Sequence, residues 1–308
     1  MSSGPFLAAD WGATNLRAWI LDQGGAVLRR AEFPLGVSRL GPGEAAARFE
    51  SEVRPALGAQ ELPALLCGMI GSTLGWASAP YLDCPVSLAK LAGGLLEVAP
   101  GVRIVPGLTC GGLIGPDLMR GEETQVLGWQ AADPARLYGR HLLCHPGTHA
   151  KWVRVEKGAV TGFVTAMTGE LYDVLGTHSV LKFSAPPRDD NLDVEAFDPQ
   201  AFDNGAAAAG DGGALASRLF GLRGLTVSGQ LPAAAAPSWL SGLLIGAEIA
   251  SLWPVVAEAD EKLVHVVGAA PLCDRYARVL TARGVGCELA DGETAVIAGL
   301  TRIWAAAP

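Results

Sequence analysis

The feature that most constrains this chain is a pair of apolar, strand-like segments joined by a short polar turn, residues 6–10 and 16–21. The turn carries the pattern D-x-G-x-T-N, formed by Asp10, Gly12, Thr14 and Asn15. Small turn residues let backbone N–H groups approach a phosphate, and a carboxylate at a strand end can hold a hydrated cation. The pattern therefore predicts phosphoryl-transfer chemistry with Asp10 as the metal ligand. A plain hairpin, whose Asp and Gly only make the turn, is the alternative.

A second segment in the middle of the chain repeats this arrangement. Residues 142–145 and 150–153 are again strand-like, and they flank a turn that contains Gly147, Thr148 and His149. Two Gly-Thr hairpins can contact one triphosphate, because each offers backbone N–H groups to an anion. The repetition therefore favours a nucleotide site over the plain-hairpin alternative.

Composition and charge exclude several classes of protein. With 308 residues, of which 50% are hydrophobic, the chain can bury a large core and has the size of about two domains. The formal net charge of −8 argues against a nucleic-acid surface, which needs a basic face. No signal peptide is predicted, since the N-terminus lacks basic residues, and the six cysteines form no C-x-x-C pair. We therefore expect a cytoplasmic protein with reduced thiols.

One apolar segment, residues 240–253, resembles a membrane helix in part. It contains a Gly242-x-x-x-Gly246 spacing, which is common where membrane helices pair. However, Glu248 would lie near mid-span, and the apolar run is shorter than the roughly 20 residues that cross a bilayer. A buried helix of a soluble domain is predicted instead. Its stripe of Gly242, Gly246 and Ala250 would let another backbone, or a flat nucleotide, come close.

The order of predicted elements indicates an α/β fold made of two similar halves, each beginning with three consecutive strands. The predicted strands are 6–10, 16–21, 26–33, 64–67, 102–105, 141–144, 152–156, 159–166 and 263–267. The predicted helices are 43–54, 169–181, 240–253, 274–282 and 294–304, with another opening near residue 121. Residues 182–213 are interpreted as a polar, Asp-rich surface insertion or lid.

Several metal and nucleotide motifs are absent or broken. Neither G-x-x-x-x-G-K-[ST] nor a strand followed by G-x-G-x-x-G occurs, so hairpins must hold any bound phosphates. Residues 189–193 start like a calcium loop, but Val194 replaces the required glycine. His145 and His149 have the spacing of a helical zinc site, but the intervening Pro and Gly prevent a helix.

Two adjacent carboxylates are candidates for the base. Phosphoryl transfer to a hydroxyl needs a carboxylate that accepts the proton, and Glu122 and Glu123 stand at the expected start of a helix. The alternative is that both acids only suit the positive end of the helix dipole. The neighbouring Arg120 favours the catalytic interpretation, because a guanidinium suits an acidic substrate or a charged transition state.

Six sequence blocks, in this order, carry a resemblance to a known family. They are D-W-G-A-T-N-L-R at 10–17, the Gly-rich block 68–81, M-R-G-E-E-T-Q at 119–125, P-G-T-H-A-K-W at 146–152, M-T-G-E-L at 167–171 and S-G-L-L-I-G-A-E at 241–248. Together they cover nearly the whole chain and resemble the 2-dehydro-3-deoxygalactonokinase family. That family belongs to the superfamily of sugar kinases, actin and heat-shock-70 chaperones. The resemblance implies two ribonuclease-H-like domains in the actin-like ATPase fold, with an interdomain cleft.

The resemblance also implies an activity and a division of the chain. It implies an ATP- and Mg²⁺-dependent kinase that phosphorylates the 6-hydroxyl of 2-dehydro-3-deoxy-D-galactonate, in galactonate catabolism. Residues 1–117 would form a sugar-acid-binding domain, with a helix of about 293–308 packed on it, and residues 118–292 a nucleotide-binding domain.

Carried onto this sequence, the resemblance gives roles to named residues. The first phosphate hairpin would contain Asp10, Gly12, Thr14 and Asn15, the second Gly147, Thr148 and His149, and the adenosine side Gly268, Ala269 and Ala270. Asp10 would hold the metal. For the base, the resemblance slightly favours Glu122 over Glu123, and Glu170 is a rival.

A sugar acid also needs a partner for its carboxylate, either a cation or a nest of N–H donors. The candidate cations are Arg17, Arg39 and Arg120. Gly71, Ser72, Trp76 and Tyr81 would shape the wall beside them. The alternative for Trp76 and Tyr81 is that they are only core or rim residues.

Other functions stay open on the sequence alone. An actin-like or chaperone-like ATPase would use the same hairpins, and another sugar or sugar-acid kinase would share the phosphate motifs. A sugar-sensing repressor would need a helix-turn-helix segment and a basic face. A small sugar acid is the expected partner, with neither nucleic acid nor membrane. The oligomeric state stays open, a homodimer included.

Overall fold

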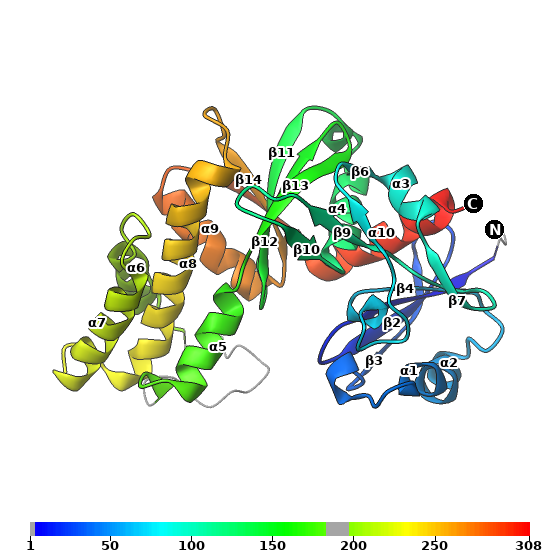
Figure 1. Ribbon diagram of the computed structural model, residues 1–308, viewed down its shortest axis with the longest axis horizontal. Coiled ribbons are helices and arrows are strands. Elements are labelled where there is room, and N and C mark those ends of the chain that lie inside the picture. Colours follow the sequence, from blue (N-terminus) through cyan, green and yellow to red (C-terminus); the bar gives the residue numbers. More distant parts are fainter. Residues whose placement is uncertain (1–3, 183–196) are drawn as a thin grey trace. The chain divides into compact units, whose positions relative to one another are not determined.

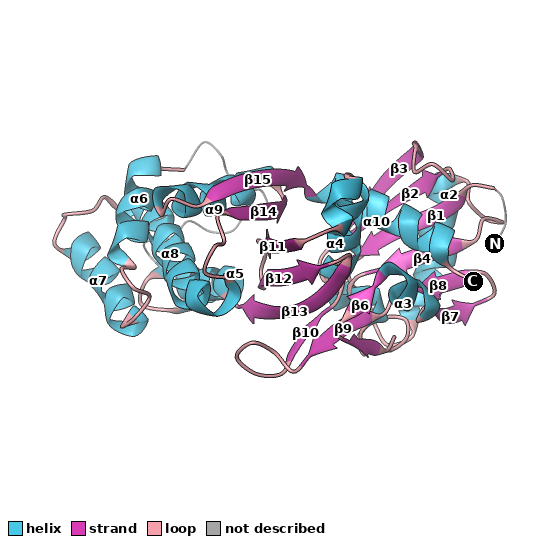
Figure 2. Cartoon of the chain, turned by 90° about the horizontal axis from the view of Figure 1, so that it is seen from above, coloured by secondary structure: helices cyan, strands magenta, loops and turns pink. Residues whose placement is uncertain are grey.

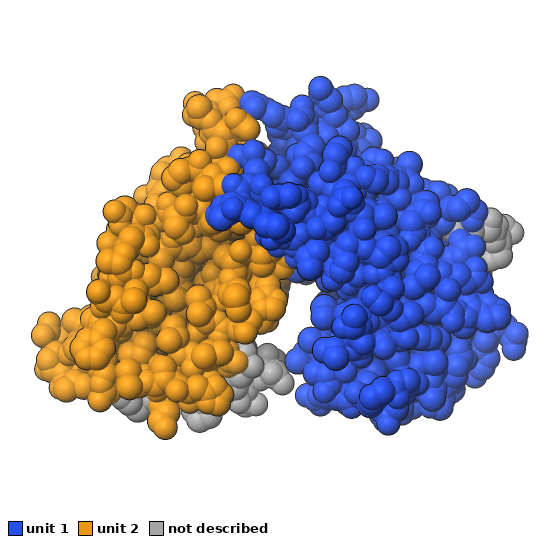
Figure 3. All heavy atoms as spheres, in the orientation of Figure 1, with its two compact units in different colours: residues 1–141, 154–163, 290–308 blue, residues 142–153, 164–289 orange. Residues whose placement is uncertain are grey.

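The computed structural model describes residues 4–182 and 197–308, which form two compact units (Figure 3). Unit 1 contains residues up to 141 together with 154–163 and 290–308, and unit 2 contains 142–153 and 164–289. The broken calcium-loop pattern at 189–193 lies outside the described residues. The domain boundary expected at 117/118 stays a prediction.

The described residues contain strands and helices of very different lengths. The strands are β1 (Phe6–Trp11), β2 (Leu16–Leu21), β3 (Val27–Phe33), β4 (Ala64–Cys67), β5 (Tyr81–Asp83), β6 (Val86–Ser87), β7 (Leu96–Ala99), β8 (Val102–Ile104), β9 (Gly107–Cys110), β10 (Asp117–Met119), β11 (Arg140–His145), β12 (Ala150–Glu156), β13 (Ala159–Ala166), β14 (Leu263–Gly268) and β15 (Gly286–Asp291). The helices are α1 (Glu44–Arg48), α2 (Arg54–Leu57), α3 (Leu88–Gly93), α4 (Glu122–Ala131), α5 (Thr168–His178), α6 (Pro199–Ala208), α7 (Leu215–Val227), α8 (Ala236–Val256), α9 (Ala270–Ala282) and α10 (Gly292–Ala306).

Unit 1 is built on a mixed sheet with the strand order β3-β2-β1-β4-β8-β7 (Figure 2). The first three strands pair antiparallel, as predicted, and β4 joins β1 in parallel. Successive side chains of a strand point to opposite faces. Leu7 and Trp11 of β1 pack in one core with Phe49, which lies in the π-helical turn between α1 and α2. Phe6, on the other face, stacks on Trp304 of α10 with ring centroids 4.5 Å apart, so helices cover both faces of the sheet.

A second sheet has the order β15-β14-β11-β12-β13-β6, and β11 pairs with β14 in parallel. Without β7, the first sheet has the order β3-β2-β1-β4-β8. Without β6 and taken from its other end, the second sheet has the matching order β13-β12-β11-β14-β15. In both sheets, three consecutive strands in reverse order are therefore followed by two later strands. The repeated supersecondary unit predicted from the sequence is therefore confirmed.

Unit 2 adds a group of helices (Figure 1). Helix α8 is the most deeply buried of them. The predicted small-residue stripe of α8 packs against α6. A Cβ on Gly242 would lie 2.0 Å from the carbonyl oxygen of Phe202, and one on Gly205 would lie 2.0 Å from that of Trp239. Of the two predicted uses of the stripe, close approach of another backbone is therefore confirmed. A flat nucleotide cannot lie on Gly242, because α6 occupies that space. The structure also corrects the interpretation of residues 182–213 as a surface insertion or lid. The described part of this segment contains α6, a helix with a buried face.

Among the described residues, one helix is long and apolar enough to cross a membrane, Ala233–Val256. Its most apolar window is 78% buried inside the protein, as expected of a core helix. The sequence-based prediction of a buried helix is therefore confirmed. All six cysteines are free thiols.

The α6–α8 contact predicts a large effect for one added methyl group. Gly242→Ala should lower the free energy of unfolding by about 2–4 kcal/mol, because its Cβ would overlap a backbone carbonyl. Gly221→Ala in α7 is the matched control, since nothing lies within 4 Å of its Cβ position, and it should be neutral or stabilising by up to about 1 kcal/mol. Urea unfolding measures both. Equal effects of the two substitutions would contradict the close packing of α6 on α8.

Candidate functional site

The carboxylate of Asp10 lies at the end of β1, where two neighbouring strands bring other groups to it. Arg17 is its antiparallel partner in β2, and Arg17 Nη2 donates to Asp10 Oδ2 over 2.6 Å. Cys67 is its parallel partner in β4, and its Sγ lies 4.0 Å from Asp10 Oδ1. Arg17, predicted as a contact of the sugar acid, is thus engaged by Asp10.

The predicted first phosphate turn lies directly after Asp10. Gly12 N donates to the carbonyl oxygen of Asn15 over 2.9 Å, and Gly36 N donates to that of Thr14 over 3.0 Å. The side chains of Thr14 and Asn15 are exposed, and so is that of Arg39, which follows Gly36 in a short 3₁₀ helix, Val37–Arg39. The structure therefore gathers Gly12, Thr14, Asn15 and Arg39 at one surface of unit 1.

Two glycines allow the start of α4 to approach Asp10. Gly68, which follows β4, has a φ of +89°, and its Cβ position lies 3.2 Å from Asp10 Oδ1. Gly121, the N-cap of α4, has a φ of +109°, and its Cβ position lies 3.2 Å from Gly68 Cα. Only glycine adopts such backbone angles without strain while leaving this space empty. The first turn of α4, with Glu122 and Glu123, therefore lies in the same part of unit 1 as Asp10.

The two candidate bases differ in their surroundings. Glu122 is partly exposed, and its Oε2 accepts from Arg120 N over 3.1 Å. Glu123 is 1% exposed, and its Oε2 accepts from Gly121 N over 2.6 Å. Burial, and then the charge of Glu122, raise the pKa of Glu123 to about 8. Both carboxylates accept backbone N–H groups at the helix start, which agrees with the alternative that they suit the helix dipole. Glu123 also has the shifted pKa that is typical of functional sites.

The raised pKa of Glu123 predicts a specific dependence of stability on pH. Its ordinary pKa is 4.5, and in the folded protein it is about 8. The contribution of Glu123 to the free energy of unfolding is therefore fully present below about pH 4.5 and decreases as the pH rises towards 8. Above about pH 8 it no longer changes with pH. A difference of one between the pKa values of the folded and unfolded states corresponds to about 1.4 kcal/mol. Glu123→Gln should gain stability relative to the wild type across this window, as measured by urea unfolding below, within and above it. Parallel pH curves would contradict a buried, protonated Glu123.

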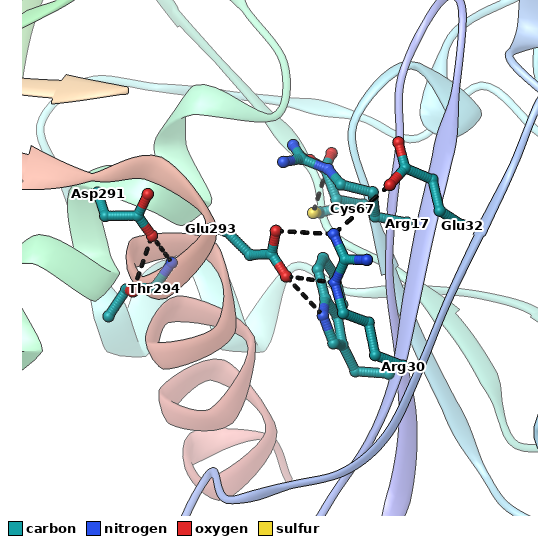
Figure 4. A network of polar contacts seen from close by, with 9 residues as sticks. Arg17, Arg30, Glu32, Cys67, Asp291, Glu293 and Thr294 are labelled. Carbon is teal, nitrogen blue, oxygen red and sulfur yellow. Dashed lines mark hydrogen bonds and ion pairs between the residues drawn. The ribbon is translucent and has the colours of Figure 1, made fainter. Parts of the chain in front are cut away.

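The first turn of α10 adds a polar network to the same sheet (Figure 4). Glu293 Oε1 accepts from Arg30 Nε over 2.7 Å and from Trp19 Nε1 over 3.2 Å, and the hydrogen bond from Arg30 lowers the pKa of Glu293. Asp291 caps the helix by accepting from Thr294 N over 2.7 Å. These bonds fix the start of α10 on β2 and β3, and they place a negative charge near Arg17.

The structure brings together only some of the residues predicted to form the sugar-acid wall. Arg120 stacks over the Tyr81 ring at 4.3 Å, and a Cβ on Gly71 would lie 2.6 Å from Arg120 Nη1, so these three residues are neighbours. Trp76 instead packs against Phe49 of the core, as its alternative interpretation expected. The hydroxyl of Ser72 accepts from Leu74 N over 3.3 Å and stabilises a turn.

In unit 2, the predicted second phosphate turn joins β11 to β12 and contacts the start of α5. A Cβ on Gly169 would lie 2.5 Å from the Gly147 carbonyl oxygen, and Glu170 N donates to that of Thr148 over 3.0 Å. His149 Nε2 lies 2.5 Å from Glu170 Oε2. His149 was predicted to contact the nucleotide and Glu170 was a rival candidate for the base, so these two residues form a pair. Thr148 and His149 are exposed.

The predicted adenosine side begins beside this turn. Gly268 ends β14, and its Cβ position lies 3.6 Å from the Pro146 carbonyl oxygen. Ala269 and Ala270 follow it and are exposed. The structure therefore brings the second hairpin and the Gly268 segment together within unit 2.

Glu248, to which no role was assigned from the sequence, connects several elements of unit 2. Its carboxylate accepts from Trp152 Nε1 and from the Tyr276 hydroxyl over 2.7 Å each, and also from the Thr168 hydroxyl. Burial raises the pKa of Glu248. A cavity of about 180 Å³ adjoins Glu248 and Thr168. A lone Glu in an apolar helix is the only sequence signal, and it does not reveal these partners.

Comparison with known proteins identifies the family. A family model described as 2-keto-3-deoxy-galactonokinase matches residues 10–303. The chain belongs to this family. The 2-dehydro-3-deoxygalactonokinase of Escherichia coli (strain K12) is 36% identical over 298 residues, which are 97% of each chain. The resemblance predicted from the six sequence blocks is therefore confirmed.

Solved structures agree with the family and with the predicted fold. The crystal structure of a putative 2-dehydro-3-deoxygalactonokinase from Sinorhizobium meliloti has 36% identity and a TM-score of 0.83, covering 97% of each chain. An activator of 2-hydroxyisocaproyl-CoA dehydratase from Clostridium difficile, solved with bound ADPNP, has a TM-score of 0.51 at 11% identity, covering 98% of this chain and 95% of its own. At that identity the likeness concerns the fold alone. The predicted α/β, actin-like ATPase fold class is confirmed.

Proposed function

We propose that this protein transfers a phosphoryl group from ATP to the 6-hydroxyl of 2-dehydro-3-deoxy-D-galactonate, in galactonate catabolism in the cytoplasm. Membership of the galactonokinase family over nearly the whole chain is the observation that carries this proposal. The candidate site supports it, because a strand-end carboxylate, two Gly-Thr turns and a buried glutamate are groups that phosphoryl transfer needs.

The residues around Asp10 fit a hydrated Mg²⁺ ion. Mg²⁺ is usually bound through one or two carboxylates together with substrate phosphates and water. Asp10 offers one carboxylate, 16% exposed, while no cluster of three or more metal-ligating side chains occurs among the described residues. When bound, the ion would neutralise charge that develops on the phosphates. Asp10 would hold it, and Arg17 keeps that carboxylate oriented.

We assign the nucleotide to the two hairpins and the Gly268 segment. Thr14 and Asn15 of unit 1, with Gly147, Thr148 and His149 of unit 2, would donate hydrogen bonds to the phosphates. Gly12, whose own N–H donates to the Asn15 carbonyl oxygen, would leave room for them. Gly268 and Ala269 would line the adenosine side. In this proposal, residues 1–117 with α10 hold most of the sugar acid and supply the first phosphate hairpin. Residues 118–292 supply the second phosphate hairpin and the adenosine side, together with Arg120 and Glu123.

We propose Glu123 as the base, in place of the slight preference for Glu122 that came from the resemblance. Two observations support Glu123. First, its pKa of about 8 is close to neutral, where a general base works best. Second, Glu123 lies close to the proposed metal ligand: burial, and then the charges of Asp10 and Glu123, raise the pKa of Cys67, whose thiol lies beside Asp10. Because Glu123 is buried, the substrate hydroxyl can reach it only after a local shift at the start of α4. Glu122 is the alternative, and Glu170 is disfavoured by its pairing with His149.

A panel of sugar acids tests the proposed function. The purified protein is incubated with ATP, Mg²⁺ and each acid in turn, and ADP release is measured. We expect 2-dehydro-3-deoxy-D-galactonate to give the highest kcat/KM. Turnover with galactonate or gluconate in its place would keep the kinase and change its acceptor, whereas ADP release independent of any acid would favour an actin-like ATPase.

A further inference from the structure

The guanidinium of Arg120 is buried, yet one of its nitrogens has no partner. Arg120 is 8% exposed. Its Nη2 donates to the Ala79 carbonyl oxygen over 2.8 Å, and its Nε donates to the Tyr81 hydroxyl over 3.4 Å. Nη1 is buried and, within the part of the chain that the structure describes, it has no hydrogen-bond partner. The acceptors that Arg120 does have are uncharged, so its positive charge is not neutralised by them.

A second buried arginine of unit 1 provides a direct comparison. Arg54 is 5% exposed, stacks on an aromatic ring at 4.9 Å, and donates to two carbonyl oxygens, as a structural arginine does. In addition, its Nε donates to the Glu50 carboxylate over 2.9 Å. Among the described residues, Arg54 leaves no buried nitrogen without a partner. Burial, aromatic stacking and bonds to carbonyls therefore do not by themselves leave a guanidinium nitrogen unsatisfied.

A glycine lies directly against Nη1. A Cβ on Gly71 would lie 2.6 Å from Arg120 Nη1, closer than real Cβ contacts, so any larger residue would displace the guanidinium. Gly71 lies in the Gly-rich segment after β4, and Arg120 directly precedes Gly121, whose Cβ position touches Gly68 beside Asp10. The unsatisfied nitrogen thus lies in the same region of unit 1 as the proposed metal and base residues.

Three arginines are candidates to bind an acidic substrate, and among them Arg120 has a buried donor, Nη1, without a hydrogen-bond partner among the described residues. Arg17 donates to Asp10 over 2.6 Å, and Arg39 is exposed to solvent, where an ion pair contributes little. A buried, unsatisfied guanidinium nitrogen favours an anionic acceptor strongly, and a carboxylate fits the guanidinium edge. We infer that Arg120 is the specificity-determining residue for the substrate carboxylate, with Nη1 as the donor to it. This inference rests on the proposed function.

The inference includes a small rearrangement on binding. Since Nη1 is buried, the carboxylate reaches it only if a neighbouring side chain shifts. Tyr81 is suited to this, because its ring stacks on the guanidinium and is 41% exposed. Neutral sugars would leave Nη1 unsatisfied, which makes Arg120 a selector of acids over neutral analogues.

The test compares 2-dehydro-3-deoxy-D-galactonate with its neutral methyl ester as acceptors. The wild type should prefer the acid. In Arg120→Gln, kcat/KM for the acid should fall about tenfold to a hundredfold, while that for the ester and the KM for ATP should change less than about twofold. Arg54→Gln is the matched control, and it should lower the unfolding temperature without changing the ratio of acid to ester.

A second variant keeps the inference testable if Arg120→Gln fails to fold. Gly71→Ala retains the arginine but pushes its Nη1 out of place, and it should also reduce the preference for the acid. If Arg120→Gln or Gly71→Ala lowers kcat/KM equally for acid and ester, Arg120 is only structural and the inference is wrong. A wild type that phosphorylates neither compound would instead reject the proposed function.

Discussion

Asp10→Asn should lower kcat by on the order of a thousandfold while the protein still folds. The substitution keeps the shape of the side chain and an oxygen for Arg17, which donates to Asp10 over 2.6 Å. It removes the negative charge that is proposed to hold Mg²⁺ beside the phosphates. Steady-state ADP release at saturating ATP measures the loss, and circular dichroism with thermal unfolding checks the fold.

The control for Asp10 lies at the other end of the same hairpin. Asp22 accepts from Gly24 N and Ala26 N over 2.8 Å each, and it only stabilises a turn. Asp22→Asn should therefore leave kcat within about twofold of the wild type. Raising the Mg²⁺ concentration should restore part of the activity of Asp10→Asn, if the charge serves the metal. Wild-type turnover by Asp10→Asn would remove Asp10 from the site.

Glu123→Gln should lower kcat by about a hundredfold to ten-thousandfold, because a general base contributes a factor of this size. The pKa of Glu123 is about 8, so the wild-type kcat should rise with pH through that value as the carboxylate loses its proton. The variant should lack this rise. The pH profile of kcat, measured at saturating substrates, reports the pKa in the bound state.

The neighbouring residue provides the control for the base. Glu122→Gln changes the same chemical group one position earlier and keeps an oxygen that can accept from Arg120 N. It should retain kcat within about tenfold and preserve the pH dependence. If Glu122→Gln shows the large loss and Glu123→Gln does not, the base is Glu122 and the preference from the resemblance was correct. A large loss in Glu170→Gln alone would assign the base to unit 2.

Much of the fold could be predicted because its signals are local. The hairpin β1–β2, the hairpin β11–β12 and helix α8 have continuous apolar patterns, and the structure confirms them. The elements that the sequence did not predict are mostly strands of two to four residues, such as β6 and β10, which are too short for a periodic pattern. Helix α6 was hidden in a polar segment, because its buried face is made largely of small residues.

The site was predictable only as far as its residues are neighbours in sequence. The two turns could be recognised from their own residues. The contact of Asp10 with Cys67 depends on the parallel pairing of β1 with β4, which the sequence does not specify. Likewise, the unsatisfied nitrogen of Arg120 depends on Gly71 and Tyr81, which lie far from it in the chain. Such long-range pairings require the three-dimensional structure.

The measurement that tests the central proposal most directly is the identity of the reaction product. The protein is incubated with ATP, Mg²⁺ and 2-dehydro-3-deoxy-D-galactonate, and the product is identified by phosphorus and carbon NMR. We predict one equivalent of ADP for each molecule of acid consumed, with the phosphate ester on carbon 6. ADP formed without any phosphorylated acid, or a phosphate attached at another position, would contradict the account.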